Sequence, residues 1–192
     1  LFEYNGKPII VYTIEKFVGR ADQIVVVMKA DQIELLEKCL SKYEIAVDQI
    51  IAGGKERYDS VRSGLAAVAE DIDCVMIHDG ARPNVSAELI NSLKKNLEAN
   101  DAVIPVVPVV DTIKVIRENR VVETPKRSEL YCVQTPQCFK KDLINKAYAE
   151  VDFSNCTDDA MVVEKYGKSV YALAGDPDNI KITTQTDLKY IK

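Results

Sequence analysis

Histidine is almost absent from this sequence, and its cysteines form no closely spaced pair. His78 is the only histidine among 192 residues, and none of the five cysteines stands in a Cys-x-x-Cys arrangement. A structural zinc site needs four nitrogen or sulfur ligands in such patterns, so the sequence argues against one. No Gly-x-Ser-x-Gly elbow occurs either. Few groups remain for acid–base or acyl-transfer chemistry, and we expect His78 only to end a strand.

Long apolar runs and an excess of positive charge are also lacking. No stretch is long and apolar enough to span a bilayer. The net charge is −5, whereas a nucleic-acid ligand requires a basic face. An odd number of cysteines without paired spacing favours reduced thiols. We therefore expect a cytoplasmic protein, or a stromal one in a plant-like source, with no nucleic-acid or membrane partner.

Short apolar runs alternate with helical patterns along the whole chain. Apolar, often β-branched runs typical of buried strands occur at residues 23–28, 50–51, 74–78, 102–110, 130–133, 170–173 and 180–182. Apolar residues at helical spacing, or caps, indicate helices at residues 9–17, 32–40, 60–68, 86–100 and 143–148, after 159 and after 184. This alternation predicts one α/β domain over residues 1–192 with a mostly parallel sheet.

The stretch from Cys74 to Pro83 carries a buried strand into a polar turn. Pro83 disfavours helix at Arg82 and removes a backbone donor, so the chain must turn there. Ligands of open α/β sheets bind beyond the carboxyl ends of the strands. We therefore expect Asp79 and Arg82 at the mouth of a binding crevice. A surface loop with a local Asp–Arg pair is the alternative interpretation.

A double glycine marks a second junction between a strand and a helix. Gly53 and Gly54 follow the short strand at residues 50–51 and precede Arg57 and Ser60 at a helix start. Glycine permits close backbone approach, and a helix N-terminus offers free amides to a phosphate. An ordinary tight turn explains the two glycines equally well.

Hydroxyl and basic side chains stand at further strand ends. Thr112 lies where the apolar run at residues 102–110 leaves the core, Arg127 follows a predicted hairpin, and Lys181 lies in a predicted short strand. Such groups suit phosphoryl or nucleotidyl transfer, in which a protein mainly positions charged groups and neutralises developing charge. Taken singly, a solvated arginine and an edge-strand lysine that discourages aggregation are sufficient explanations.

Six motifs, taken together and in order, resemble those of one enzyme family. They are Gly53-Gly54-x-x-Arg57-x-x-Ser60, His78-Asp79-Gly80-Ala81-Arg82-Pro83, Asp111-Thr112-Ile113-Lys114, Arg127-x-x-Leu130 with Gln134-Thr135-Pro136-Gln137, Thr157-Asp158-Asp159 and Asn179-Ile180-Lys181. Over residues 1–192 the chain is similar to the 2-C-methyl-D-erythritol 4-phosphate cytidylyltransferases of the non-mevalonate isoprenoid pathway. The resemblance implies a Rossmann-like, three-layer α/β sandwich of the nucleotide-diphospho-sugar transferase type, with a protruding β-hairpin arm.

The resemblance also implies a reaction and roles for residues. A phosphate oxygen of methylerythritol phosphate attacks the α-phosphorus of CTP, and pyrophosphate leaves. The attacking phosphate is already an anion, so no strong base is required. By this resemblance Arg127 and Lys181 are catalytic. The same resemblance assigns substrate binding to Asp79, Arg82, Thr112, Thr135 and Thr157, and nucleotide binding to Gly53, Gly54, Ser60, Gly80 and Ala81.

Two further expectations come from the family. Mg²⁺ would lie among the triphosphate oxygens, and no protein ligand can be assigned to it. The family opens with a strand and a glycine-rich loop that bears an arginine, followed by a lysine. The sequence starts after these features, and we expect an N-terminal piece to be missing from it.

Residues 111–127 are expected to form an arm that holds a homodimer together. An isolated two-stranded hairpin is marginal in water, and the apolar residues of this one need a surface to cover them. In related enzymes the arm completes the neighbour's site, which would bring Arg127 to the partner's substrate. The alternative is a hairpin that folds back on its own sheet.

Two other functions stay open at this point. One is the related ribitol-5-phosphate cytidylyltransferase activity, and the other is a non-catalytic nucleotide-binding module. A dinucleotide-dependent oxidoreductase is disfavoured because no Gly-x-Gly-x-x-Gly follows a predicted strand.

Overall fold

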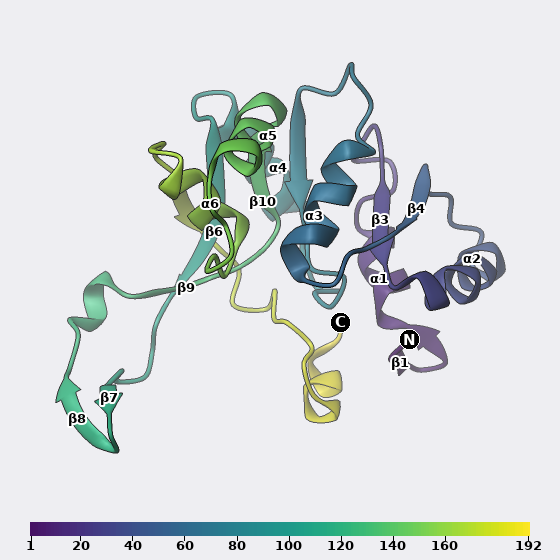
Figure 1. Ribbon diagram of the computed structural model, residues 1–192. Coiled ribbons are helices and arrows are strands. Elements are labelled where there is room, and N and C mark those ends of the chain that lie inside the picture. Colours follow the sequence, from purple (N-terminus) through teal and green to yellow (C-terminus); the bar gives the residue numbers. More distant parts are fainter.

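The computed structural model describes residues 1–192 (Figure 1). The helices are α1 (Ile9–Glu15), α2 (Ile33–Lys42), α3 (Arg57–Ala66), α4 (Ala87–Leu97), α5 (Lys141–Glu150) and α6 (Asp159–Lys165), with 3₁₀ turns η1 (Ala30–Gln32), η2 (Arg127–Glu129) and η3 (Gln185–Tyr190). The strands are β1 (Glu3–Tyr4), β2 (Lys7–Pro8), β3 (Val25–Met28), β4 (Gln49–Ala52), β5 (Cys74–Ile77), β6 (Ala102–Pro108), β7 (Val115–Arg117), β8 (Arg120–Glu123), β9 (Tyr131–Val133), β10 (Gln137–Lys140) and β11 (Tyr171–Ala174).

The central sheet has five strands. Four of them follow the order β11-β6-β10-β5, and β9 pairs with the C-terminal end of β6, Val106 to Pro108. β6 and β11 are parallel, whereas β10 is antiparallel to both of its neighbours. β5, β6 and β11 therefore run in one direction, and β9 and β10 run against them. The predicted α/β class is confirmed. The pairing is more mixed than the alternating pattern predicts, because β10 enters between β5 and β6 as the chain returns from the arm.

A second, two-stranded sheet lies beside the first. β3 and β4 are parallel and pair from Val25 with Gln49 to Met28 with Ala52. β3 and β5 each have one edge without a strand partner, and both strands line a cavity of about 680 Å³. Residues of α1, α3 and α4 also line this cavity. It therefore lies within the plane of the sheets, with helices on either side.

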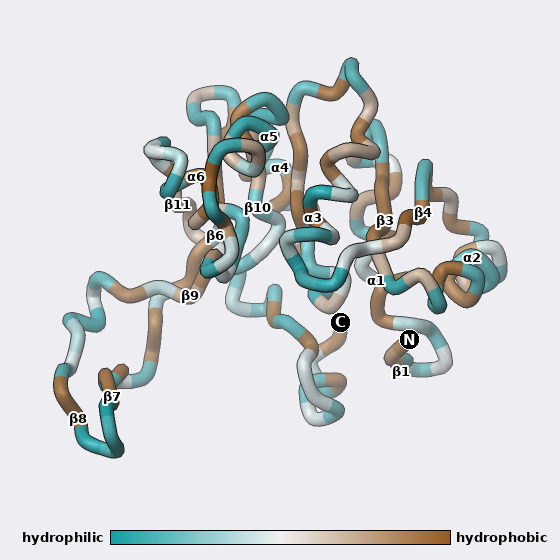
Figure 2. The backbone as a smooth tube through the Cα atoms, in the orientation of Figure 1, coloured by the Kyte–Doolittle hydropathy of each residue, from teal (hydrophilic) through white to brown (hydrophobic).

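Alternate strand residues pack against two layers of helices. Ala102 and Phe139 pack in one cluster with α3, α5 and α6, and their neighbours Val103 and Cys138 pack with α4. α1 and α2 pack together over Val26 of β3. The first four residues of β6 are buried, which explains the continuous apolar run at its start. Figure 2 shows this hydrophobic colouring along the strands between the helical layers. The sandwich has three layers, as the resemblance implies.

The predicted hairpin is confirmed as β7 and β8, which pair only with each other. Glu118 and Asn119 at its tip both have positive φ angles, as a two-residue turn with the right-handed twist of a hairpin requires. Figure 1 shows this arm projecting away from the rest of the molecule. Ile116 and Val121 on the arm are about three-fifths exposed, at 61% and 59%. The hairpin does not fold back on its own sheet.

Other predicted elements differ from the structure in position or type. Residues 180–182 form no strand. Their backbone makes a single isolated hydrogen bond, in which the Ile182 amide donates to the Ala81 carbonyl (2.8 Å). The segment after Thr184 has the expected capping box, with Asp187, but forms the 3₁₀ turn η3. α3 begins at Arg57, earlier than predicted, because Glu56 and Asp59 form a capping box there. None of the helices is both long and apolar enough to cross a membrane.

Candidate active site

The turn after β5 is held together by the pair that the sequence predicts. Arg82 Nε lies 3.2 Å from Asp79 Oδ2, and the Arg82 amide donates to the Asp79 carbonyl (3.0 Å). Arg82 Nη1 also donates to the carbonyl of Asn179 (2.7 Å), which is almost a hundred residues further along the chain. Both charged side chains are largely buried. The turn is therefore tied to the C-terminal segment by Arg82, which argues against a free surface loop.

Lys181 joins this pair from the C-terminal segment. Its Nζ lies 3.2 Å from Asp79 Oδ2, and its side chain is 48% exposed, against 18% for Asp79. Burial alone would raise the pKa of Asp79, but the charges and hydrogen bonds of Lys181 and Arg82 outweigh it and lower that pKa. Asp79 thus stays ionised between two cations. Of these two, Lys181 has the ammonium that is open to an incoming anion.

The double glycine is required by close packing. The Gly53 amide donates to the Met28 carbonyl (2.7 Å), which carries the chain from β4 across the end of β3. A Cβ on Gly53 would lie 2.5 Å from Ser60 Oγ, and one on Gly54 would lie 2.2 Å from Asp59 Cβ. Neither glycine has a positive φ angle, so a tight turn does not account for them. The chain here lies close against the start of α3.

One end of the cavity brings the two junctions together. Its lining includes Ser60 and Arg57 from the start of α3, and His78, Asp79 and Gly80 from the end of β5. Three predicted site residues that are distant in sequence, Ser60, Asp79 and Gly80, therefore share one hollow at the carboxyl ends of the strands. The other predicted residues of the two junctions and Lys181 lie outside its lining: Gly53, Gly54, Ala81, Arg82 and Lys181. This is the place at which open α/β sheets bind ligands.

Arg57 connects this cavity to α6. Its guanidinium donates two hydrogen bonds to the carboxylate of Asp159, at 3.1 and 2.6 Å, and Tyr148 donates a third (2.6 Å). Asp159 is fully buried. Burial opposes the charge of Arg57, but the pairing with Asp159 prevails and raises the pKa of Arg57. The predicted site omits Arg57, although it belongs to the first of the six motifs. Its bidentate partner could not be identified from sequence.

The three predicted threonines occupy different environments. Thr135 is buried, and its hydroxyl accepts a hydrogen bond from the Asp79 amide (3.0 Å), so it lies directly behind the Asp79 turn. Thr157 is exposed and immediately precedes Asp158, which caps α6. Thr112 is exposed at the base of the arm. Only Thr135 is bonded to the turn that carries Asp79 and Arg82.

Arg127 lies on the arm, in η2. Its Nη1 donates to the carbonyl of Val110 (2.9 Å), at the other side of the arm's base. No hydrogen bond or ion pair links Arg127 or Thr112 to Asp79, Arg82 or Lys181. Within one chain the structure therefore separates the predicted arm residues from the cavity.

The structure contains no ready-made metal cage. No three histidine, cysteine or acidic side chains gather where they could hold one ion. Asp79 in the cavity is already paired with two cations. Mg²⁺ commonly takes most of its ligands from substrate phosphates and water, and these residues would fit only that mode of binding.

Comparisons with known proteins agree with this geometry. A family model described as "IspD: 2-C-methyl-D-erythritol 4-phosphate cytidylyltransferase" matches residues 1–192. A protein of that name from Clostridium botulinum (strain Eklund 17B) is 47% identical over 190 residues, which are 96% of this chain and 84% of the relative. One from Clostridium perfringens (strain SM101) is 43% identical over 97% of this chain and 85% of its own length.

The comparison with solved structures agrees with the family match. The crystal structure of 4-diphosphocytidyl-2C-methyl-D-erythritol synthase from Anaerococcus prevotii superimposes with a TM-score of 0.88 at 32% identity, over 98% of this chain and 86% of that one. The family model covers every motif on which the sequence resemblance rests. The chain belongs to the 2-C-methyl-D-erythritol 4-phosphate cytidylyltransferase family.

Proposed function

We propose that the chain transfers CMP from CTP to 2-C-methyl-D-erythritol 4-phosphate, which yields 4-diphosphocytidyl-2-C-methyl-D-erythritol and pyrophosphate in isoprenoid biosynthesis. The observation that carries the proposal is the shared cavity end, where Asp79 and Gly80 meet the start of α3, with Lys181 bonded to Asp79. The relatives named above carry the name of this enzyme, which supports methylerythritol phosphate over ribitol phosphate.

The reaction needs positioned charge more than it needs a base. An oxygen of the substrate phosphate forms a bond to the α-phosphorus of CTP, and the bond from that phosphorus to the bridging oxygen of pyrophosphate breaks. The electron pair of the broken bond leaves with pyrophosphate. The nucleophile is already an anion at neutral pH, so no proton must be removed from it. This agrees with a chain whose only histidine is buried as a neutral group.

Lys181 is the proposed electrostatic catalyst. Its ammonium is held at Asp79 yet remains about half exposed, so it can contact phosphate oxygens without first breaking a buried pair. A cation held in place in advance stabilises charge that develops in the transition state. Arg82 is held by both Asp79 and the Asn179 carbonyl, which suits a fixed contact with the substrate.

The nucleotide is assigned to the glycine junction. Gly53 and Gly54 carry no side chains of their own, and their backbone lies against the side chains of Ser60 and Asp59. Ser60 lies one turn into α3. Gly80 and Ala81 are proposed to form the opposite wall of the cytidine site. Mg²⁺ is proposed to enter bound to the phosphates of CTP, as the absence of a side-chain cluster for it favours.

Arg127 and Thr112 are proposed to act on the partner's substrate in a homodimer. Their separation from the cavity in one chain and the exposed apolar residues of the arm support this arrangement. Arginine is suited to the task because its planar fork binds phosphate oxygens in pairs. We place the protein in the cytoplasm, in keeping with five free cysteines and bacterial relatives.

Product analysis tests the proposed function. The full chain is incubated with CTP, Mg²⁺ and either methylerythritol phosphate or ribitol 5-phosphate, and the phosphorus resonances of the products are followed. We expect the diphosphate product and pyrophosphate from methylerythritol phosphate. A faster reaction with ribitol phosphate would assign the chain to the rival activity. Binding of CTP without turnover of either substrate would support the non-catalytic module.

A further inference from the structure

His78 closes a chain of hydrogen bonds that runs behind the Asp79 turn. The Asp79 amide donates to Thr135 Oγ1 (3.0 Å), and this hydroxyl lies 2.9 Å from His78 Nδ1. The other ring nitrogen, Nε2, lies 3.2 Å from the carbonyl oxygen of Arg82. The imidazole is therefore connected to both ends of the turn, at Asp79 through Thr135 and at Arg82 directly.

The partners of the ring determine where its proton lies. A carbonyl oxygen can only accept, so Nε2 must carry the hydrogen that points at Arg82. The Thr135 hydroxyl already accepts the Asp79 amide, and its own hydrogen is free to be donated to Nδ1. Every donor in this chain of hydrogen bonds then has one acceptor. The arrangement fits a neutral imidazole with its proton on Nε2.

The surroundings of the ring favour this neutral form. Phe17, just after α1, packs against His78 with ring centroids 5.1 Å apart and ring planes tilted by 55°. The charged groups nearest to it, Asp79 and Arg82, belong to its own turn and act in opposite directions. Burial lowers the pKa of His78 to about 4. His78 can therefore serve as a fixed donor and acceptor across the ordinary pH range.

We propose that His78 is a positioning residue that sets the spacing of the Asp79–Arg82 turn through the Thr135 hydroxyl and the Arg82 carbonyl. The turn carries the Asp79 carboxylate, to which both Arg82 and Lys181 are bonded. A displacement of the turn would move all three charged groups relative to the substrate phosphate. The consequence for turnover rests on the proposed function, whereas the hydrogen-bond chain stands on the geometry alone.

A matched pair of variants at Thr135 separates the hydroxyl from the bulk of the side chain. Thr135→Val keeps the shape and removes the link to Nδ1, and Thr135→Ser keeps the link. Because the chain has a single histidine, isotope-labelled histidine gives one pair of ring nitrogen resonances, which report the tautomer and the pKa directly. Circular dichroism and thermal unfolding verify that each variant is folded.

In the unmodified protein we expect the proton on Nε2 and no protonation of the ring down to about pH 5. Thr135→Val leaves Nδ1 without its donor, so it is expected to shift the Nδ1 resonance and to lower kcat by roughly tenfold to a hundredfold, with little change in the KM for CTP. Thr135→Ser is expected to restore both the Nδ1 resonance and kcat. His78→Leu, which removes both links, should lower kcat at least as far as Thr135→Val.

The ring nitrogen resonances and the kinetic measurements test the inference separately. A proton on Nδ1, or a charged ring at pH 7, would overturn the inference whatever the activity. An unchanged Nδ1 resonance together with an unchanged kcat in a folded Thr135→Val variant would overturn it as well. If the unmodified protein makes no product, the proposed function fails, and the resonances of the ring still decide whether His78 holds the turn.

Discussion

At the scale of single residues, the buried carboxylate of Asp159 makes the strongest prediction about stability. Asp159→Ala leaves the guanidinium of Arg57 and the hydroxyl of Tyr148 without their partner. Removing one member of a fully buried ion pair costs about 3–5 kcal/mol. The Arg57 side chain is 42% exposed, so water reaches the remaining charge in part, and the expected loss here is about 2–3 kcal/mol. Urea unfolding measures the loss. Glu129→Ala, in the exposed pair with Lys126, serves as the control and should cost no more than about 0.5 kcal/mol. Equal losses in the two variants would contradict this account.

His78 gives a second prediction, for the pH dependence of stability. In the unfolded chain the imidazole binds a proton near its ordinary pKa of 6.5, whereas in the folded protein it does so only near 4. Between these values the unfolded state binds more protons, so stability is complete above pH 6.5 and falls as the pH falls towards 4. We expect a loss of about 2 kcal/mol between pH 7 and pH 5. Urea titrations of the unmodified protein and His78→Gln test it, and the variant should lose most of this dependence.

At this scale the sequence indicated which residues belong to the site more readily than it indicated which side chains they contact. Asp79, Arg82 and Lys181 were predicted as site residues, and the structure brings them together. His78 was expected only to end a strand. Its role depends on Thr135, and the two residues meet only because β10 begins two residues after Thr135 and pairs with β5. No local pattern in the sequence carries that information.

At the scale of the elements, the glycine junction before α3 can be tested by adding one carbon atom. In Gly54→Ala the new Cβ would overlap Asp59 Cβ, which belongs to the capping box of α3. The loop must move, and we expect the affinity for CTP to fall by roughly tenfold, measured by titration calorimetry. Gly19→Ala is the control. It has open space but a positive φ angle, so it should cost about 1 kcal/mol of stability and leave CTP affinity unchanged. Unchanged CTP affinity in Gly54→Ala would remove this junction from the nucleotide site.

Elements with strong periodicity were predicted well, and short ones were not. α4 was predicted from Ser86, whose side chain accepts a hydrogen bond from the Leu89 amide. β10 was not predicted, because its four residues follow a proline and show no clear pattern. They are nevertheless buried between β5 and β6. Residues 180–182 show the opposite error, since an apolar pattern that suggests a strand packs into a loop instead. Tertiary contacts decide the structure of such short segments.

At the scale of the whole molecule, the arm predicts a shared active site. Arg127→Ala and Lys181→Ala subunits are each expected to be nearly inactive as pure dimers. If Arg127 acts in trans and Lys181 in cis, a mixed dimer contains one site with both residues intact. Activity should then recover after subunit exchange, towards about a quarter of the unmodified level for random mixing, since half of the dimers regain one of two sites. Native mass spectrometry confirms the exchange. No recovery despite complete exchange, or a monomer in sedimentation, would exclude the shared site.

The overall architecture could be predicted from the pattern of apolar residues along the chain. The alternation of apolar runs and helical patterns predicts an α/β sandwich, and the sandwich is confirmed. The projecting hairpin was predicted from the family resemblance, and Figure 2 shows its apolar residues along β7 and β8.

Lys181 offers the most direct test of the central claim, that the charged groups around Asp79 promote the transfer of CMP from CTP. The measurement is the initial rate of diphosphate product formation by Lys181→Ala with both substrates saturating. Loss of a preorganised cation should lower kcat by roughly a hundredfold, which is about 3 kcal/mol. The variant should keep its unfolding free energy, because the side chain is about half exposed.

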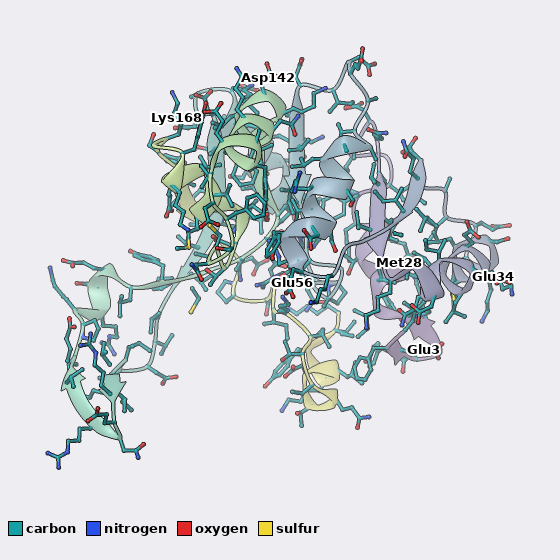
Figure 3. The ribbon with its side chains drawn as sticks, in the orientation of Figure 1. Glu3, Met28, Glu34, Glu56, Asp142 and Lys168 are labelled. Atoms are coloured by element: carbon teal, nitrogen blue, oxygen red, sulfur yellow. The ribbon has the colours of Figure 1, made fainter.

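Lys168→Ala is the matched control, because Figure 3 shows Lys168 on the same side as Asp142 and apart from Glu56 at the start of α3. It should react at the unmodified rate. A hundredfold loss confined to Lys181→Ala is the result that this account predicts. Product formation by a folded Lys181→Ala variant at the unmodified rate would contradict it.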